Sequence, residues 1–394
     1  MLNVVILNGG RGASSIIPAL LSRQRLHVTS IVNAYDDGKS TGASRRFFGM
    51  LGPSDIRKVQ ELMLPKDDPE HEDYVTLFQY RFPLDCNRED VLEQLKLFLD
   101  SESMELVGVH LNNTRVREKL KSFLAEFLAG LNTIEKARQE EFDFADCSIM
   151  NCLYAGAFLA SNRNIEQATI SIDRLFQLRG KVLPTSIEDK KLVAQRENGE
   201  ILYSEAEIVE LRSNVRVERI YLLDQSLDKV TFEMLDNDEK RSYLERHHCY
   251  VGASPGVRRA LQQADIIIYS AGTQHSSLYP TYMSTGLAES ISDNHSALKV
   301  FITNIGADYE TPSYKASDYI LGAHRYLNLS DERNYSMEEL FDVIYINQSH
   351  FKDDETYVEY DEEGFQNISI RSLIDVFESE DNPGKHNGTK VVKT

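Results

Sequence analysis

The sequence predicts an α/β fold built on a parallel sheet, and two observations lead to this prediction. Short β-branched runs bounded by turn residues occur at 3–8 and 28–33, with a stretch of helical character between them. The same strand–helix–strand pattern returns at 265–270 and 299–304. Such runs are typical of buried parallel strands, and strands that alternate with helices join one sheet through right-handed crossovers.

The middle of the chain interrupts this alternation. Within 83–145 there are few strand-like runs, and apolar residues at 91–131 recur at helical spacing with charges on much of the opposite faces. This pattern predicts a pair of amphipathic helices that form an inserted helical arm. The arm either stabilises the fold or acts as a cap over a site, and the first interpretation is the simpler one.

Three further segments complete the organisation. Turns and strand-like pieces at 181–240 predict a small β-rich excursion. In the acidic C-terminal portion, 331–394, we expect a helix at 337–346 and a surface turn at 381–390. No internal repeat or low-complexity linker divides the sequence, so we expect residues 1–394 to form a single domain.

Composition and charge exclude several classes of function. The net charge is −19, and residues 331–394 hold 16 acidic against 6 basic residues. A chain this acidic without a basic patch is a poor partner for nucleic acid or an anionic membrane. No apolar run reaches the length that crosses a bilayer, and the four cysteines follow no zinc or disulfide spacing. We therefore expect a cytoplasmic protein.

The loop after the first predicted strand is rich in glycine. Gly9, Gly10 and Gly12 precede Ser14, and a helix follows. Glycines let a backbone approach a ligand closely, and the start of a helix offers free N–H groups to an anion. The spacing matches neither the Walker loop nor the dinucleotide fingerprint, and any tight strand-to-helix turn also uses glycine.

The loop after the second predicted strand concentrates charge. Asp36 and Asp37 are adjacent, which suits a magnesium ion that also binds phosphate oxygens, or a general base for an acceptor hydroxyl. Arg45 and Arg46 follow and could offer forked donors to phosphate. The structural alternative is an Asp-Asp-Gly turn with a helix cap at Ser44.

Other candidates follow later strand ends. Asp55 and Arg57 stand at the start of a further predicted helix, where Asp55 also suits a structural cap. The loop 271–277 carries hydroxyls and His275, which could donate to phosphate or act as an acid or base. Asn304 follows the fourth strand. In open parallel sheets ligands collect beyond the carboxyl ends of the strands, so these loops predict one shared pocket.

Several segments together resemble the family that contains 2-phospho-L-lactate transferase and the bacterial gluconeogenesis factor. The similar segments occur in the family's order and lie at 31–58, 77–82, 148–159, 178–186, 271–280, 299–306, 314–324 and 385–390. The resemblance implies a Rossmann-like parallel sheet with helices on both faces. Only the helical stretch at about 83–145 falls outside it and looks like an insertion.

The resemblance implies two possible functions. One is a magnesium-dependent transferase that moves a phosphorus-containing group from a nucleoside-diphosphate-linked donor to a hydroxyl. The alternative is a non-catalytic regulator of carbon metabolism or cell-wall synthesis that binds a UDP-sugar. The ligand is thus a nucleoside diphosphate or nucleotide sugar, magnesium is the expected cofactor, and a homodimer is possible.

By the same resemblance, Asp36 and Asp37 correspond to the family's paired carboxylates and Asn151 to an asparagine of its site. Lys39 and Arg11 stand where the family has glycine and threonine. The catalytic and metal-binding candidates are Asp36 and Asp37. The candidate ligand-binding residues are Gly9, Gly10, Gly12, Ser14, Ser40, Arg45, Arg46, Asp55, Arg57, Asn151, Gly272, Thr273, His275, Ser276, Ser277 and Asn304.

Overall fold

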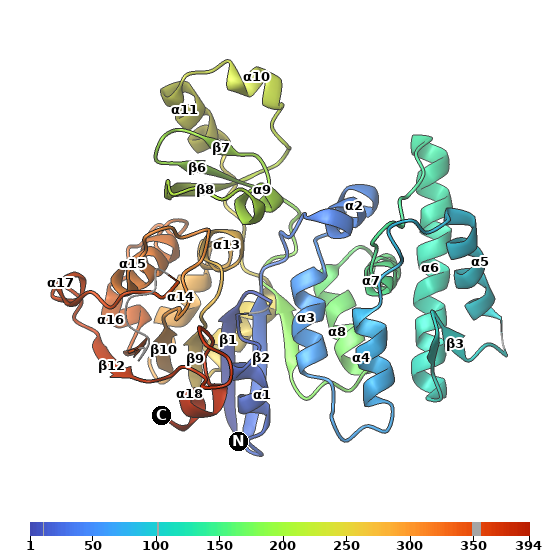
Figure 1. Ribbon diagram of the computed structural model, residues 1–394, viewed down its shortest axis with the longest axis horizontal. Helices are drawn as coiled ribbons and strands as arrows, with labels where there is room; N and C mark the ends of the chain where they lie inside the picture. The colour runs from blue at the N-terminus through green and yellow to red at the C-terminus, as the bar shows by residue number, and fades with distance from the viewer. Residues whose placement is uncertain (11, 101, 349–355) are drawn as a thin grey trace.

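A computed structural model of the chain describes residues 1–10, 12–100, 102–348 and 356–394 (Figure 1). Arg11, one of the departures from the family pattern, lies outside these residues. Among the described residues, no helix is long and apolar enough to cross a membrane.

Seven of the described strands form one parallel sheet, as predicted. Their order across the sheet is β12 (Arg371–Asp375), β11 (Val343–Asn347), β10 (Leu298–Ile302), β9 (Ile266–Tyr269), β1 (Leu2–Asn8), β2 (Leu26–Val32) and β5 (Lys181–Pro184). The Rossmann-like α/β fold is therefore confirmed.

The first strand lies at the centre of the sheet. Residues 4–8 of β1 are buried, and β1 pairs with β2 on one side and β9 on the other. The strand order reverses direction between β1 and β9, which makes this edge the switch point where ligands bind in open α/β sheets. The sheet is also surrounded by eight of the described helices, which follow β1 or come after β8 in the chain. They are α1 (Ile16–Leu21), α12 (Pro255–Gln262), α13 (Tyr279–Tyr282), α14 (Leu287–Ser292), α15 (Ala316–Leu327), α16 (Met337–Leu340), α17 (Glu362–Phe365) and α18 (Gly388–Lys393).

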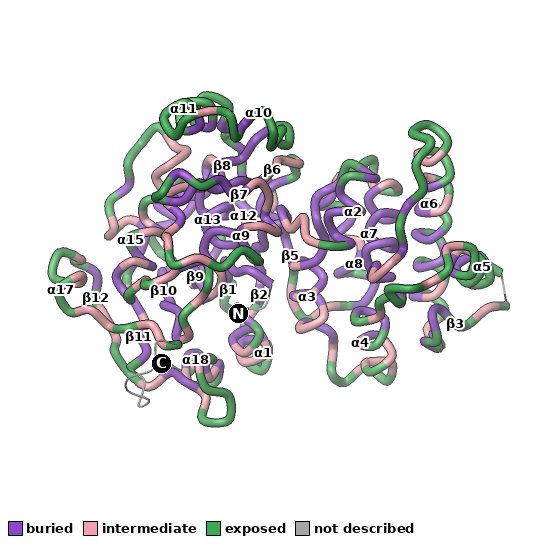
Figure 2. Tube along the Cα trace, turned by 45° about the horizontal axis from the view of Figure 1, so that its top comes forward, coloured by how far each residue is buried: buried purple, intermediate pink, exposed green. Residues whose placement is uncertain are grey.

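The segment between β2 and β5 forms a helical half of the molecule, on the right in Figure 1. It contains α2 (Lys39–Phe48), α3 (Ser54–Leu62), α4 (His71–Gln79), α5 (Arg88–Leu99), α6 (Thr114–Arg138), α7 (Ile149–Ala160) and α8 (Ile165–Leu175), with a hairpin of β3 (Glu105–Leu106) and β4 (Val109–His110). The two predicted amphipathic helices are α5 and α6. Their inner faces are buried and their outer faces are exposed (Figure 2).

A small subdomain stands above the sheet. Its antiparallel sheet consists of β6 (Lys191–Arg196), β7 (Ile201–Leu202) and β8 (Val217–Leu223), with α9 (Glu205–Glu210), α10 (Lys229–Glu233) and α11 (Asn237–His247). Val193, Tyr221, Phe232 and Leu244 belong to a hydrophobic cluster separate from the main core. The predicted β-rich excursion is therefore a subdomain with a small hydrophobic cluster of its own. Helix α9 packs beside β6 and β7, and its Ile208 belongs to the main core.

One prediction for the tail is wrong, and another is incomplete. The helix predicted at 337–346 ends at Leu340, and Val343–Asn347 is strand β11. Its β-branched residues pair with β10 at the sheet, and this tertiary pairing outweighs the apparent helical spacing. The segment 381–390 is not only a surface turn, because Gly388 begins helix α18, which packs on α1.

The contact between α6 and α7 gives a test of this fold. A Cβ atom on Gly156 would lie 1.8 Å from the Phe123 carbonyl oxygen, a backbone atom that cannot move aside. We expect Gly156→Ala to lower the free energy of unfolding by about 1–3 kcal/mol, the usual cost of overpacking. Urea denaturation measures this change. Gly252→Ala is the control, because no atom lies within 4 Å of its added methyl group; an equal loss in both variants would contradict the packing argument.

Candidate functional site

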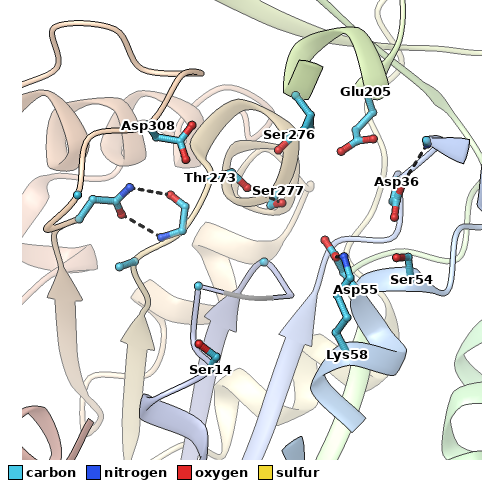
Figure 3. A pocket seen from close by; sticks show the side chains of 18 of the residues that line it. Ser14, Asp36, Ser54, Asp55, Lys58, Glu205, Thr273, Ser276, Ser277 and Asp308 are labelled. Atoms are coloured by element: carbon cyan, nitrogen blue, oxygen red, sulfur yellow. Dashed lines mark hydrogen bonds and ion pairs between the residues drawn. The ribbon is translucent and has the colours of Figure 1, made fainter. Parts of the chain in front are cut away.

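A cavity of about 600 Å³ opens at the carboxyl ends of the central strands (Figure 3). Its walls come from the loops after β1, β2, β9 and β10, from α3 and α9, and from residues 384–386 near the C-terminus. Asp36 and Ser277, which are far apart in the sequence, both line it. The segments that sequence reasoning placed at one site therefore meet at one cavity.

Direct contacts hold three of these loops together. The Asn304 amide accepts from the Gly272 N–H at 2.9 Å and donates to its carbonyl oxygen at 3.0 Å (dashed lines in Figure 3). A Cβ atom on Gly12 would lie 2.2 Å from the Ala271 carbonyl oxygen, so the loop after β1 touches the loop after β9 only because this residue is glycine. The cavity floor is thus preformed.

Ten of the eighteen predicted site residues line the cavity. They are Gly9, Gly12, Ser14, Asp36, Asp55, Gly272, Thr273, Ser276, Ser277 and Asn304. The other eight do not belong to its lining. They are Gly10, Asp37, Ser40, Arg45, Arg46, Arg57, Asn151 and His275.

The two adjacent carboxylates point to different partners. Asp36 accepts from the Gly38 N–H at 3.0 Å and lines the cavity. Asp37 accepts from the Ala206 N–H at 3.0 Å, so it holds the start of α9. Asp37 therefore connects the loop after β2 to the small subdomain, and the paired-carboxylate arrangement is not formed.

Arg45 and Arg57 donate to backbone carbonyl oxygens, and none of the three predicted arginines lines the cavity. Arg45 is fully buried and donates to the Tyr35 carbonyl oxygen and to Asp189, both at 2.5 Å. Arg57 donates to the Phe78 carbonyl oxygen at 2.8 Å. Arg46 is exposed in the last turn of α2, since residues 39–48 are helix and not loop. That helix begins after Gly38, so Ser44 does not cap it.

A buried carboxyl group occupies the N–H groups of the loop after β9. Residues Gln274–Leu278 form one turn of π-helix, and Glu310 accepts from the N–H groups of His275 and Ser276, each at 2.9 Å. These two donors are therefore not free for a phosphate. His275 itself is buried, and burial lowers the pKa of its ring to about 3, so the ring is neutral at pH 7.

Two predicted residues of the helical half are buried and do not line the cavity. Ser40 accepts from Arg81, which lines the cavity, at 3.4 Å. Asn151 is fully buried in the first turn of α7, and its side-chain amide has no hydrogen-bond partner among the described residues. Gly10 lies against Asp55, with a backbone φ of +21°.

Sequence reasoning missed several lining residues. Glu205 reaches the cavity from α9, opposite Asp36 and Asp55 (Figure 3). Burial, with a smaller effect of Asp36, raises the pKa of Glu205 to about 9, so it is protonated at pH 7. Burial, then repulsion from Asp55, also raises the pKa of Asp36. No local motif marks Glu205, because it lies 169 residues beyond Asp36 and belongs to another subdomain.

The lining cations fall into two kinds. Lys58 pairs with Asp55 at 2.7 Å, and Arg81 pairs with Asp146 at 3.2 Å. Lys39 and Lys385 also line the cavity, and neither has an ion pair with the part of the chain that the structure describes. Arg81 lies in the 77–82 segment that resembles the family, which was the available signal for it.

The oxygen donors of the cavity decide whether it fits a magnesium ion. Within the described ranges, no group of three or more Asp, Glu, His or Cys side chains is arranged to hold a metal ion. A magnesium ion, however, needs only one or two carboxylates when ligand phosphates and water supply the other oxygens. Asp36 and Asp55 fit that more limited requirement, whereas Asp37 does not.

Glu310 gives a pH test of this arrangement. Burial raises its pKa to about 8, against 4.5 for an exposed glutamate. Between these values the folded chain keeps a proton that the unfolded chain has released, so this carboxyl favours unfolding increasingly as the pH rises, by at most about 1.4 kcal/mol per pH unit. The glutamine of Glu310→Gln does not ionise in this pH range in either state, so the stability of this variant lacks this dependence on pH.

We therefore expect the stability of Glu310→Gln, relative to the unmodified chain, to improve between pH 5 and pH 8. Urea denaturation at both pH values measures this difference. The exposed Glu363→Gln is the control and should show no such trend. A constant difference between the Glu310→Gln variant and the unmodified chain would contradict the raised pKa.

Comparisons with known proteins agree with the fold and identify the family. The family model described as 2-phospho-L-lactate transferase CofD matches residues 4–378. The chain is 24% identical to a gluconeogenesis factor from Listeria monocytogenes, over 98% of this chain and 92% of that one. It is also 24% identical to a putative gluconeogenesis factor from Thermotoga maritima, over 99% and 97%.

A solved structure shows the same fold. The crystal structure of a UPF0052 family protein from Bacillus halodurans superposes with a TM-score of 0.68 at 21% identity, and the match covers 100% of this chain and 99% of that one. The family model, in turn, spans nearly the entire chain. This chain belongs to the CofD family.

Proposed function

We propose that the chain is a non-catalytic protein that binds a nucleoside diphosphate or nucleotide sugar in the cavity. The name of its relatives, gluconeogenesis factor, supports a role in carbon metabolism. One observation carries the proposal: loops after four strands form one preformed cavity with a glycine and hydroxyl floor. A volume of about 600 Å³ is within the range of small-molecule sites.

The floor of the cavity suits phosphate oxygens. Gly9 and Gly12 present only backbone there, while Ser14 and Ser277 add hydroxyl donors. Lys385, delivered by the C-terminal segment, supplies positive charge that no described carboxylate neutralises. Because the N–H groups held by Glu310 are already used, the phosphates should lie toward the β1 loop and not over the π-helix.

A second candidate is a magnesium-dependent transferase, and the carboxylates at one end of the cavity favour it. Asp36 and Asp55 would hold the metal, which supplies charge neutralisation for the phosphates during transfer. Asp36 would alternatively accept a proton from an acceptor hydroxyl, since its raised pKa makes it a better base than an ordinary aspartate.

Ligand binding and turnover separate the two candidates. Thermal shift and calorimetry with UDP, GDP, UDP-glucose and UDP-N-acetylglucosamine, with and without magnesium, test binding. Chromatography of the same mixtures, incubated with a panel of hydroxyl acceptors, tests for a transfer product and for the released nucleotide. A shift without product supports the binding protein, a product supports the transferase, and the absence of any shift would refute both.

Lys385→Ala tests the phosphate site. We expect the dissociation constant of the best nucleotide to rise about tenfold, since one charge-assisted contact is worth roughly 1.5 kcal/mol. Lys385 is exposed, so folding should be unaffected. Lys390→Ala, on α18 and paired with Glu380, is the control. Equal affinities for Lys385→Ala and the control would contradict the role of Lys385.

Asp36→Asn tests the transferase. If the second candidate is correct, turnover should fall by at least about 100-fold, the usual contribution of a positioned base, while nucleotide affinity without magnesium changes little. Asp37→Asn is the control variant and should keep its turnover, because the asparagine side-chain oxygen can still accept from the Ala206 N–H. Turnover that survives in Asp36→Asn would remove this residue from the chemistry.

A further inference from the structure

Lys39 combines two unusual properties at the cavity wall. It is the first residue of α2, it is exposed, and it lines the cavity. Its backbone φ is +44°, in the left-handed region that non-glycine residues seldom adopt. A residue kept in a strained conformation at a binding site is a reason to look for a function that compensates for the strain.

The strain is fixed by the surrounding turn. Arg45 holds the Tyr35 carbonyl oxygen, and Asp36 accepts from the Gly38 N–H. Asp37 is tied to α9 through Ala206. These contacts determine the path of the chain into α2, and glycine at position 39 would follow that path without strain. A lysine here therefore adds a side chain at a conformational cost.

The charge of that side chain is not used within the protein. Lys58 and Arg81 are neutralised by Asp55 and Asp146, but Lys39 has no ion-pair partner in the described part of the chain. Lys385, the other such cation in the lining, belongs to the opposite end, because Gly384 lies against Gly306 in the loop after β10. Asp36 and Asp308 lie on opposite sides of the cavity, and Ser14 and Ser277 lie between them (Figure 3).

We propose that Lys39 is a specificity residue that selects nucleotide ligands with an acidic group on the part attached to the diphosphate, such as a sugar acid. The inference rests on the proposed nucleotide binding. A diphosphate over the glycine floor, near Lys385, leaves its attached group facing Lys39 and Asp36. A sugar acid matches both, because its carboxylate pairs with the lysine and its hydroxyls donate to the aspartate.

Matched ligands test the proposal. UDP-glucose and UDP-glucuronate differ only by a hydroxymethyl group against a carboxylate, as do GDP-mannose and GDP-mannuronate. We use the pair whose parent diphosphate binds more tightly in calorimetry. The unmodified chain should bind the acidic member at least tenfold more tightly. In Lys39→Gln this preference should disappear, while affinity for the free diphosphate stays within about threefold.

The variant Lys39→Gly removes both the charge of the side chain and the backbone strain at position 39, so it shows the effect of each on a different measurement. It should lose the same preference but raise the thermal unfolding midpoint, since glycine adopts the left-handed conformation freely. Gln139→Gly is the control, because Gln139 ends α6 at φ +54° and does not line the cavity. It should raise the midpoint and keep the ligand preference.

Each result is informative. No preference in the unmodified chain, or a preference that survives in Lys39→Gln, overturns the role of Lys39 while nucleotide binding stands. Failure of UDP, GDP and all four sugar nucleotides to bind overturns the proposed function and this inference with it. Loss of the preference in both Lys39 variants, with diphosphate affinity retained, supports it.

Discussion

The close approach of Gly12 to the Ala271 carbonyl oxygen is the constraint on which the site depends. It allows the loop after β1 to lie directly against the loop after β9, at the point where the strand order reverses. Asn304 then ties the loop after β10 to Gly272 through two hydrogen bonds. A side chain at position 12 would separate these loops, and the cavity would lose its floor.

Local ion pairs decide how an acidic protein holds an anionic ligand. The chain carries a net charge of −19, yet the charges of the cavity are largely compensated: Asp55 by Lys58, and Glu205 by retaining its proton. The unpaired lysines at positions 39 and 385 then set the local field at short range, where screening by salt is weakest. Net charge is a guide to the protein's surroundings as a whole and says nothing about this local balance of charges.

Local patterns predicted the fold and the loops, but not the direction of individual side chains. Gly9, Ser14 and Ser277 lie at the cavity because strand-end loops of a parallel sheet must meet at one edge. Arg45 does not, because its partner Asp189 comes from a distant segment that the sequence could not place beside it. The 337–346 segment was misread for the same reason, since only pairing with β10 reveals the strand.

The parts of the site that were missed come from chain segments outside the parallel sheet. Glu205 is carried by a subdomain that has a separate hydrophobic core, and Asp37 links its helix α9 to the loop after β2. Lys385 arrives with a C-terminal segment docked on α1 through α18. The parallel sheet therefore supplies the floor of the cavity, whereas these attached segments supply the walls. Residues that distinguish one ligand from another belong to walls, because a wall can change without disturbing the sheet, and Lys39 stands at the junction of the two.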